Sequence, residues 1–415
     1  MIIKAFGEKY HKFLEENLKQ YNYIKKHDGF NMSLLRLDEN KYLFAIRVLG
    51  VIPAYFGEEI IPGNYSSSEK YIREKIGKNV SNKINFGKNF FWGEWNKSLI
   101  DNTIFFIGYL DKNTLNFEID TKIKPYVIFN YPIKDLKYYY SDVRLFKFKN
   151  KIFCYDGYIS GIYQIVIEHS KINAAFPLNE GMTKLTFYTD ICKNIKQYDK
   201  NWAYLTSNIY DGIPYFVFLN WFENGTVTMS YLPKKVKIKE CIKKVAITMK
   251  GDKIDGLGNN IFPMFSFGTP MYELIKDKLW IGSGHIKILN TLEYKNNNII
   301  NFRNKITELK KKYKYIQHLS YIYLTYHIVL IKKEDKWNML ISDGYLYIPT
   351  NKYYVFSINF PMGIDVNNNN VIISMGFGDY YNGIVSYDLS EFIKMCNHNV
   401  ELFDYNKYNF HIIEK

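Results

Sequence analysis

The sequence predicts an all-β protein, and three observations support that fold class. Most of the chain after residue 28 consists of short segments rich in aromatic and β-branched residues, bounded by Asn, Asp, Lys or Gly. Glu223-Asn224-Gly225 separates two such segments and is a strong hairpin signal. Few stretches have helical periodicity. Many short strands joined by tight turns are typical of a barrel, a sandwich or a propeller.

The elements follow from the spacing of apolar residues. Strands are expected over residues 41–49, 104–110, 143–148, 151–158, 163–168, 184–189, 215–222, 226–232, 244–249, 271–275, 278–282, 322–331, 337–342, 353–360, 371–376 and 383–387. Helices are expected over residues 5–27, 68–83, 304–318 and 389–395. The first helix carries Phe6, Tyr10, Phe13, Leu14 and Leu18 at helical spacing, which predicts an amphipathic helix packed on the main body.

A loose unit recurs along the strands. It consists of a polar fragment, two hairpins and a longer loop, and it is about 50–80 residues long, a little longer than well-known propeller blades. Five such units fill the chain after the first helix. Since no shift in composition marks a linker, we expect residues 1–28 to form a helix packed on one domain that spans residues 29–415.

The charge balance favours anionic ligands. Lys and Arg number 55 against 41 Asp and Glu, a formal net charge of +14 in 415 residues. The lysines are scattered along the chain instead of forming a stripe, so we expect no nucleic-acid partner. Nothing in the sequence indicates an oligomeric state.

Compartment and cofactors are predicted from what the sequence lacks. No signal-peptide core and no apolar run of about 18 residues is visible, which predicts a cytoplasmic protein without a membrane span. The four cysteines are far apart, so structural zinc and a disulfide scaffold are not expected. The eight histidines show no metal-binding spacing, and dinucleotide and phosphate-loop fingerprints are absent. We therefore expect no metal and no cofactor.

Five polar fragments beside strands form the candidate site. If strand ends converge around an axis, these fragments meet in one pocket that holds arginines, lysines, a histidine and at least two carboxylates. Such a mixture suits an anionic ligand handled by an acid. The fragments are Asn31-Met32-Ser33 with Arg47, Ser141-Asp142-Val143-Arg144, Asp199-Lys200-Asn201-Trp202, Gly268-Thr269-Pro270 with Gly284-His285-Ile286-Lys287, and Gly376-Phe377-Gly378-Asp379.

In this order and spacing, the fragments resemble the motifs of the five-bladed β-propeller β-mannoside phosphorylases and the related mannosyltransferases, over about residues 30–390. The family's acidic motif has Glu and Pro where this chain has Ser141 and Val143. The resemblance implies a five-bladed β-propeller, with Asp142 as the acid and Arg144 binding phosphate. It also implies sugar contacts from Asn31, Ser33, Asn201, Trp202, Thr269 and Asp379.

The residue types fit these roles, although each has a simpler interpretation. Asp142 and Arg144 are two positions apart, which on a strand places both side chains on one face; a salt bridge at a strand edge is the alternative. His285 and Lys287 alternate in the same way and suit phosphate. Lys200-Asn201-Trp202 offers a cation, an amide and a flat ring to a sugar, or else a solvated lysine and a core tryptophan.

The balance of charges favours group transfer over hydrolysis. Inverting hydrolysis needs two carboxyl groups, whereas Asp142 is the single well-matched acid among the cations Arg47, Arg144, Lys200, His285 and Lys287. We expect an inverting glycosyl-transfer enzyme that moves a mannosyl group between a nucleotide sugar or sugar phosphate and a glycan. The alternatives are a phosphorylase or hydrolase of β-mannosides and an inactive propeller that binds glycans or proteins.

Overall fold

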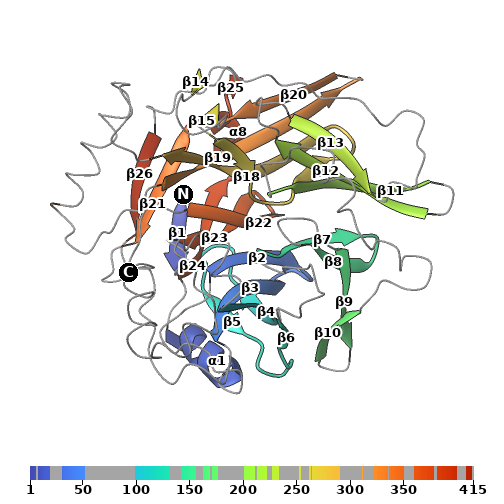
Figure 1. Ribbon diagram of the computed structural model, residues 1–415, viewed down its shortest axis with the longest axis vertical. Coiled ribbons are helices and arrows are strands. Elements are labelled where there is room, and N and C mark those ends of the chain that lie inside the picture. The colour runs from blue at the N-terminus through green and yellow to red at the C-terminus, as the bar shows by residue number, and fades with distance from the viewer. Residues whose placement is uncertain are drawn as a thin grey trace, which may run out of the picture.

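The structure is a computed structural model, and most of its described residues lie in β-strands (Figure 1). It describes residues 1–5, 8–18, 30–51, 99–129, 142–155, 162–168, 171–175, 201–210, 213–221, 227–232, 252–253, 261–262, 264–289, 311, 321–334, 336–349, 359–377, 381–399 and 408–413. The all-β prediction is confirmed at this level. The described strands pair antiparallel with their neighbours apart from one parallel pair near the C-terminus.

The first two sheets come from the N-terminal half. One contains β2 (Phe30–Arg36), β3 (Lys41–Val51), β4 (Leu99–Leu110), β5 (Phe117–Ile119) and β6 (Tyr126–Phe129). Its strand order is β2-β3-β4-β5, and β6 also pairs with β4. The next contains β7 (Arg144–Phe148), β8 (Lys151–Tyr155), β9 (Ile162–Glu168) and β10 (Lys171–Ala175), which pair in chain order.

A third sheet confirms the predicted hairpin. It contains β11 (Ala203–Tyr210), β12 (Ile213–Trp221) and β13 (Val227–Leu232). Trp221 pairs with Val227 at the end of the hairpin next to the turn. The turn itself, which carries Asn224-Gly225, lies outside the described residues.

The largest sheet is built around the long pair β18 (Leu279–Leu289) and β19 (Tyr321–Lys333). Its other strands are β16 (Met264–Phe267), β17 (Tyr272–Ile275), β20 (Lys336–Ile341), β21 (Gly344–Pro349), β25 (His398–Asn399) and β26 (Tyr408–Ile413). A separate short pair is formed by β14 (Asp252–Lys253) and β15 (Ile261–Phe262).

The last sheet joins the two ends of the sequence. It has the order β1-β24-β23-β22, where β1 is Ile2–Ala5, β22 is Asn359–Asn367, β23 is Asn370–Phe377 and β24 is Tyr381–Asp388. Ile2 of β1 pairs with Ser386 of β24. The expectation that a helix begins at Ala5 is therefore wrong, because the β-branched residues at the start of the chain complete this sheet instead.

The first helix, α1, spans Glu8–Leu18 and packs as its pattern predicts. Tyr10 and Leu14 are buried in a cluster with Phe44, Phe106 and Ile384, from β3, β4 and β24. The helix thus covers the junction between the first and the last sheet. The remainder of the predicted helix, residues 19–27, lies outside the described residues.

The other predicted helices have different outcomes. The helix α8, Leu389–Met395, forms where expected, and Asp388 caps its N-terminus by accepting from the amides of Ser390 and Glu391. The helix predicted over 68–83 and nearly all of 304–318 fall outside the described residues, as do the strands predicted over 184–189 and 244–249. Among the described helices, none is long and apolar enough to cross a membrane.

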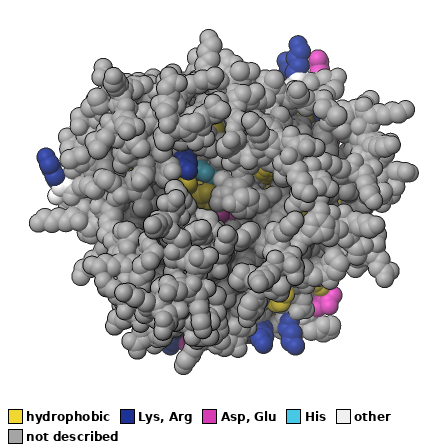
Figure 2. All heavy atoms as spheres, in the orientation of Figure 1, with side chains coloured by type: hydrophobic (Ala, Val, Ile, Leu, Met, Phe, Trp, Pro, Cys, Tyr) yellow, Lys and Arg dark blue, Asp and Glu magenta, His cyan; other side chains and the backbone are white. Residues whose placement is uncertain are grey.

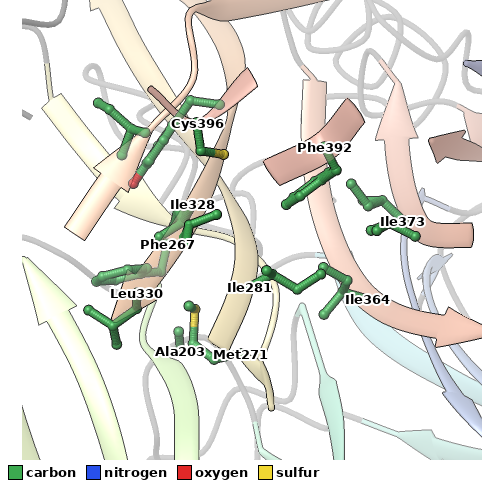
Figure 3. Close-up of a cluster of buried hydrophobic side chains, with 14 of the residues drawn as sticks. Ala203, Phe267, Met271, Ile281, Ile328, Leu330, Ile364, Ile373, Phe392 and Cys396 are labelled. Atoms are coloured by element: carbon green, nitrogen blue, oxygen red, sulfur yellow. The ribbon is translucent and has the colours of Figure 1, made fainter. Parts of the chain in front are cut away.

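A large apolar cluster holds the C-terminal sheets together (Figure 3). Ala203 of β11, Phe267 of β16, Ile281 of β18, Ile364 of β22 and Phe392 of α8 are among its members. Three sheets meet through their edge strands, because β2 lies against both β7 and β22. In Figure 1 these strands lie near the centre of the view, and the sheets extend outward from them.

Candidate active site

The centre of the candidate site is a buried aspartate in an unusual backbone conformation. Asp142 directly precedes Val143 and β7, is 2% exposed, and has φ of 59°. A residue other than glycine rarely occupies this left-handed region, and a residue held there costs about 1–3 kcal/mol. Such conformations cluster at functional sites, where the surrounding structure determines them.

Two residues of the first sheet hold the Asp142 carboxylate. Oδ1 accepts a hydrogen bond from Nδ2 of Asn31 at 2.6 Å and from Nη1 of Arg47 at 3.1 Å. Arg47 is 7% exposed, so this ion pair lies in a low-dielectric setting. The predicted convergence of Asp142 with Arg47, 95 residues away in the sequence, is thus present.

Asn31 is placed by an irregularity in β2. The pairing of β2 with β3 shifts register between Phe30 and Ser33, and Asn31 has φ of 54°. A bulge of this kind redirects a side chain out of the strand pattern. Gly376 of β23 approaches so closely that a Cβ there would lie 2.3 Å from Oδ1 of Asn31. A side chain at position 376 therefore cannot coexist with this placement of Asn31.

Arg144 connects Asp142 to two other parts of the chain. Its Nη1 donates to the Asp142 carbonyl at 3.0 Å, Nε to the Gly268 carbonyl at 2.5 Å, and Nη2 to Oδ1 of Asn201 at 3.1 Å. The prediction that Asp142 and Arg144 share a strand face does not hold. Asp142 precedes the strand and has a left-handed backbone, so strand alternation does not reach it.

Aromatic rings link Arg144 to His285 and Lys287. Phe360 lies with its ring centre 5.9 Å from Cζ of Arg144 and 4.5 Å from the His285 ring. Tyr323 stacks on His285 at 5.0 Å, and Nζ of Lys287 lies 6.0 Å from the same Tyr323 ring. Because His285 and Lys287 contact one tyrosine, the prediction that they share a face of their strand is confirmed.

The molecular surface is hollowed where charged groups gather. Figure 2 shows a depression at the centre of one face, in which basic, acidic, histidine and hydrophobic side chains lie together. Lys287 and Tyr323 are partly exposed, whereas His285 and Phe360 are buried at 2% and 4% exposure. The cations and aromatic rings thus range from the buried carboxylate region to the surface.

Three residues predicted to contact sugar bond or pack within the protein. Ser33 Oγ accepts from the Leu145 amide at 3.2 Å and so ties β2 to β7. Thr269 Oγ1 accepts from the Ser283 amide at 2.9 Å. Trp202 is 3% exposed and packs in a cluster with Phe146 and Phe218. Lys200 and Asp379 lie outside the described residues.

Phe360 and Tyr323 belong to this arrangement but were not among the predicted site residues, whereas Gly376 belongs to one of the five predicted fragments. Phe360 ends a predicted strand, so the rule that strand ends converge could have included it. Tyr323 lies inside a predicted strand and carries no local signal. Among the described residues, no group of three or more metal-ligating side chains is present.

Comparisons with known proteins give structural similarity only. No protein-family model matches the chain, and neither does any curated protein sequence. A β-1,2-mannobiose phosphorylase from Listeria innocua is 10% identical, with 89% of this chain and 91% of that chain covered and a TM-score of 0.41. A glycosyl hydrolase from Bacteroides ovatus is 10% identical, with coverages of 88% and 86% and a TM-score of 0.42.

A mannose phosphorylase from Leishmania mexicana in complex with phosphate ion is 12% identical, with 92% of this chain and 94% of that chain covered and a TM-score of 0.37. A mannobiose phosphorylase and a mannose phosphorylase are thus among the solved structures similar to this chain.

Proposed function

We propose that this protein is an inverting glycoside phosphorylase that cleaves a β-mannoside with inorganic phosphate. The observation that carries the proposal is the buried Asp142 carboxylate held by Arg47, with His285 and Lys287 linked to it through Arg144 and aromatic rings. The mannoside as substrate class is taken from the motif resemblance.

Phosphorolysis assigns a task to each charged group. A phosphate oxygen attacks the anomeric carbon while the glycosidic C–O bond breaks. Asp142 enters this step protonated and gives its proton to the departing oxygen, and it leaves the step as the carboxylate that pairs with Arg47. Lys287, His285 and Arg47 stabilise the charge on phosphate. The product is a sugar 1-phosphate of inverted configuration. In the reverse direction, the Asp142 carboxylate accepts the proton of the acceptor hydroxyl.

The choice of phosphorolysis over hydrolysis rests on the carboxylates. Inverting hydrolysis requires a second carboxyl group at about 6.5–9.5 Å from the first, to activate water. Asp142, bonded to Arg47 and Asn31, is the one predicted site carboxylate among the described residues, because Asp379 lies outside them. The nucleotide-sugar transfer first favoured from sequence stays a prediction. The clustered cations suit a small anion such as inorganic phosphate without requiring a nucleotide.

The proposed fold is a single five-bladed β-propeller over residues 29–415. It is supported by the antiparallel sheets that follow one another along the chain and by the contacts of β2 with β7 and β22. The pairing of β1 with β24 is the kind of link that closes a ring of blades, because the N-terminal strand completes the last sheet. The active site would then lie at one end of the central axis.

Turnover of defined substrates tests the function. We expect the protein to convert β-linked mannobiose to mannose 1-phosphate and mannose when phosphate is present. Asp142→Asn should lower kcat by about 10²–10⁴-fold, because the acid is lost. Asp120→Asn is the matched control, since Asp120 is also a buried aspartate, paired with Lys41 at 3.2 Å, but outside the site.

The other outcomes identify the alternatives. Release of GDP from GDP-mannose in the presence of an acceptor, without phosphate-dependent cleavage, would establish a mannosyltransferase. Cleavage that does not depend on phosphate would establish a hydrolase. Sugar binding without turnover, unchanged in Asp142→Asn, would establish a binding protein. Each of these three results contradicts the proposal.

A further inference from the structure

Every nitrogen of the Arg144 guanidinium donates a hydrogen bond within the protein. Nε, Nη1 and Nη2 each donate a hydrogen bond at 2.5, 3.0 and 3.1 Å, to the Gly268 carbonyl, the Asp142 carbonyl and the Asn201 side chain. The Phe360 ring covers one face at 5.9 Å, and the residue is 0% exposed. Arg144 therefore presents no accessible surface to a ligand.

The partners of Arg144 lie in segments whose positions leave little freedom. Two are backbone carbonyls, one of them on the strained residue Asp142 and the other on Gly268. Gly268 itself packs so closely that a Cβ would lie 2.4 Å from the Pro361 carbonyl. Asn201 directly precedes Trp202 and β11. A guanidinium has five N–H groups in a rigid fork, so it can hold all three segments at fixed positions.

The side chain and the backbone of Asp142 are thus held by different residues. Arg47 and Asn31 bond its carboxylate, whereas Arg144 bonds its carbonyl. A left-handed aspartate persists only when its surroundings determine its backbone. Loss of the Arg144 bond would allow the Asp142 backbone to relax and the carboxylate to turn away from its working position.

We infer that Arg144 is a positioning residue for Asp142 and not a ligand of phosphate. This reverses the role that the motif resemblance implies for it. The kinetic part of the inference rests on the proposed function, but the binding and exchange measurements do not. Lys287, which is partly exposed and lies over Tyr323, is the residue to which a direct contact with phosphate is assigned.

Steady-state kinetics separate the two roles. In Arg144→Met, we expect kcat to fall about 100-fold, since a displacement near 1 Å has an effect of that size. KM for phosphate should stay within about threefold of the wild type, and the acid limb of the pH–rate profile should move. In Lys287→Met, KM for phosphate should rise about tenfold, as expected for a lost charged hydrogen bond. A tenfold rise in KM for phosphate in Arg144→Met would overturn the inference.

Misfolding of Arg144→Met could also lower kcat, so the test includes a second variant and a second measurement. Asn201→Leu removes one partner of Arg144 and keeps the guanidinium, so it should also lower kcat and leave phosphate binding by calorimetry unchanged. Arg144→Lys should speed amide hydrogen exchange in residues 142–145, 201–204 and 266–271 more than in β3. If exchange in those segments is unchanged, Arg144 does not position them.

Failure of the proposed function gives a different pattern. If the wild type neither binds phosphate nor cleaves mannosides, the phosphorylase proposal is wrong. The exchange measurement on Arg144→Lys still decides whether Arg144 holds the three segments together.

Discussion

At the scale of single residues, the site depends on two strained positions that support each other. Asn31 and Asp142 both have left-handed backbones, and they meet through a hydrogen bond of 2.6 Å. The sequence identified both as site residues and placed them at strand ends. It could not indicate their left-handed backbones, because no glycine, the residue that usually marks such a conformation, is next to either position. Nor could it show that Gly376, distant in the chain, leaves the space that Asn31 occupies.

Gly376→Ala should disturb catalysis by displacing Asn31. The added Cβ would lie 2.3 Å from Oδ1 and 2.7 Å from the backbone nitrogen of Asn31, so β2 must shift at Asn31. We expect kcat to fall at least about tenfold and the free energy of unfolding to fall by about 1–3 kcal/mol. Urea unfolding and initial rates measure the two effects.

Gly344→Ala is the control for this change. Its Cβ would meet the end of the Leu324 side chain at 2.9 Å, away from Asp142, so it should alter stability without altering kcat at equal folded concentration. If Gly376→Ala retains wild-type kcat, Asn31 does not need its observed position for catalysis.

At the scale of elements, the local pattern predicted strands well and long-range pairing poorly. The helix α8 and the β12–β13 hairpin formed where short-range signals placed them. The N-terminal segment differed because β1 pairs with β24 from the opposite end of the chain, and no local preference encodes that pairing. The same segment then positions the site. Asn382 accepts from the Met32 amide at 3.0 Å and donates to the Tyr10 hydroxyl at 3.1 Å.

Tyr10→Phe tests the connection between α1 and β2. The change removes the hydroxyl that accepts from Asn382, which is 2% exposed, and leaves the ring in its cluster. We expect a loss of about 1 kcal/mol in the free energy of unfolding. Tyr109→Phe removes a hydrogen bond to Asp120 from a tyrosine that is 41% exposed, so its effect should be smaller. Equal effects would show that the Tyr10 hydroxyl has no special role.

At the scale of the whole molecule, a buried histidine couples stability to pH. His327 of β19 is 0% exposed, and its Nδ1 is 2.8 Å from the Ser283 hydroxyl. Burial, and to a smaller extent the nearby His411, lower its pKa from the ordinary 6.5 to about 3. As the pH falls, His327 therefore binds a proton in the unfolded chain before it does so in the folded protein. The contribution of neutral His327 to the stability of the folded protein is complete above about pH 6.5 and is lost as the pH falls toward 3.

This linkage predicts a measurable difference between variants. Between pH 7 and pH 5, the neutral state of His327 should account for about 2 kcal/mol of lost stability. His327→Phe should lose that much less over the same interval, whatever its stability at pH 7. His398→Asn is the control, because His398 is partly exposed beside Asp343. Urea unfolding at both pH values decides the matter, and identical pH dependence in wild type and His327→Phe would show that His327 is not responsible.

The whole-molecule arrangement could be predicted only in outline. Strand-rich composition and repeated polar fragments indicated that strand ends meet. The hydrogen bonds of Asp142 with Arg47, and of Arg144 with Asn201 and Gly268, confirm that for four of the fragments. Gly376 of the fifth fragment lies against Asn31. The composition could not indicate that Ser33, Thr269 and Trp202 bond or pack within the protein, since their use depends on how neighbouring sheets approach.

The stereochemistry of the first product tests the central claim most directly. Proton NMR of a reaction started from a β-mannoside and phosphate should show α-mannose 1-phosphate as the initial product, formed by wild type and nearly absent with Asp142→Asn. Accumulation of β-mannose 1-phosphate, or of free mannose alone, would contradict a single inverting displacement by phosphate assisted by Asp142.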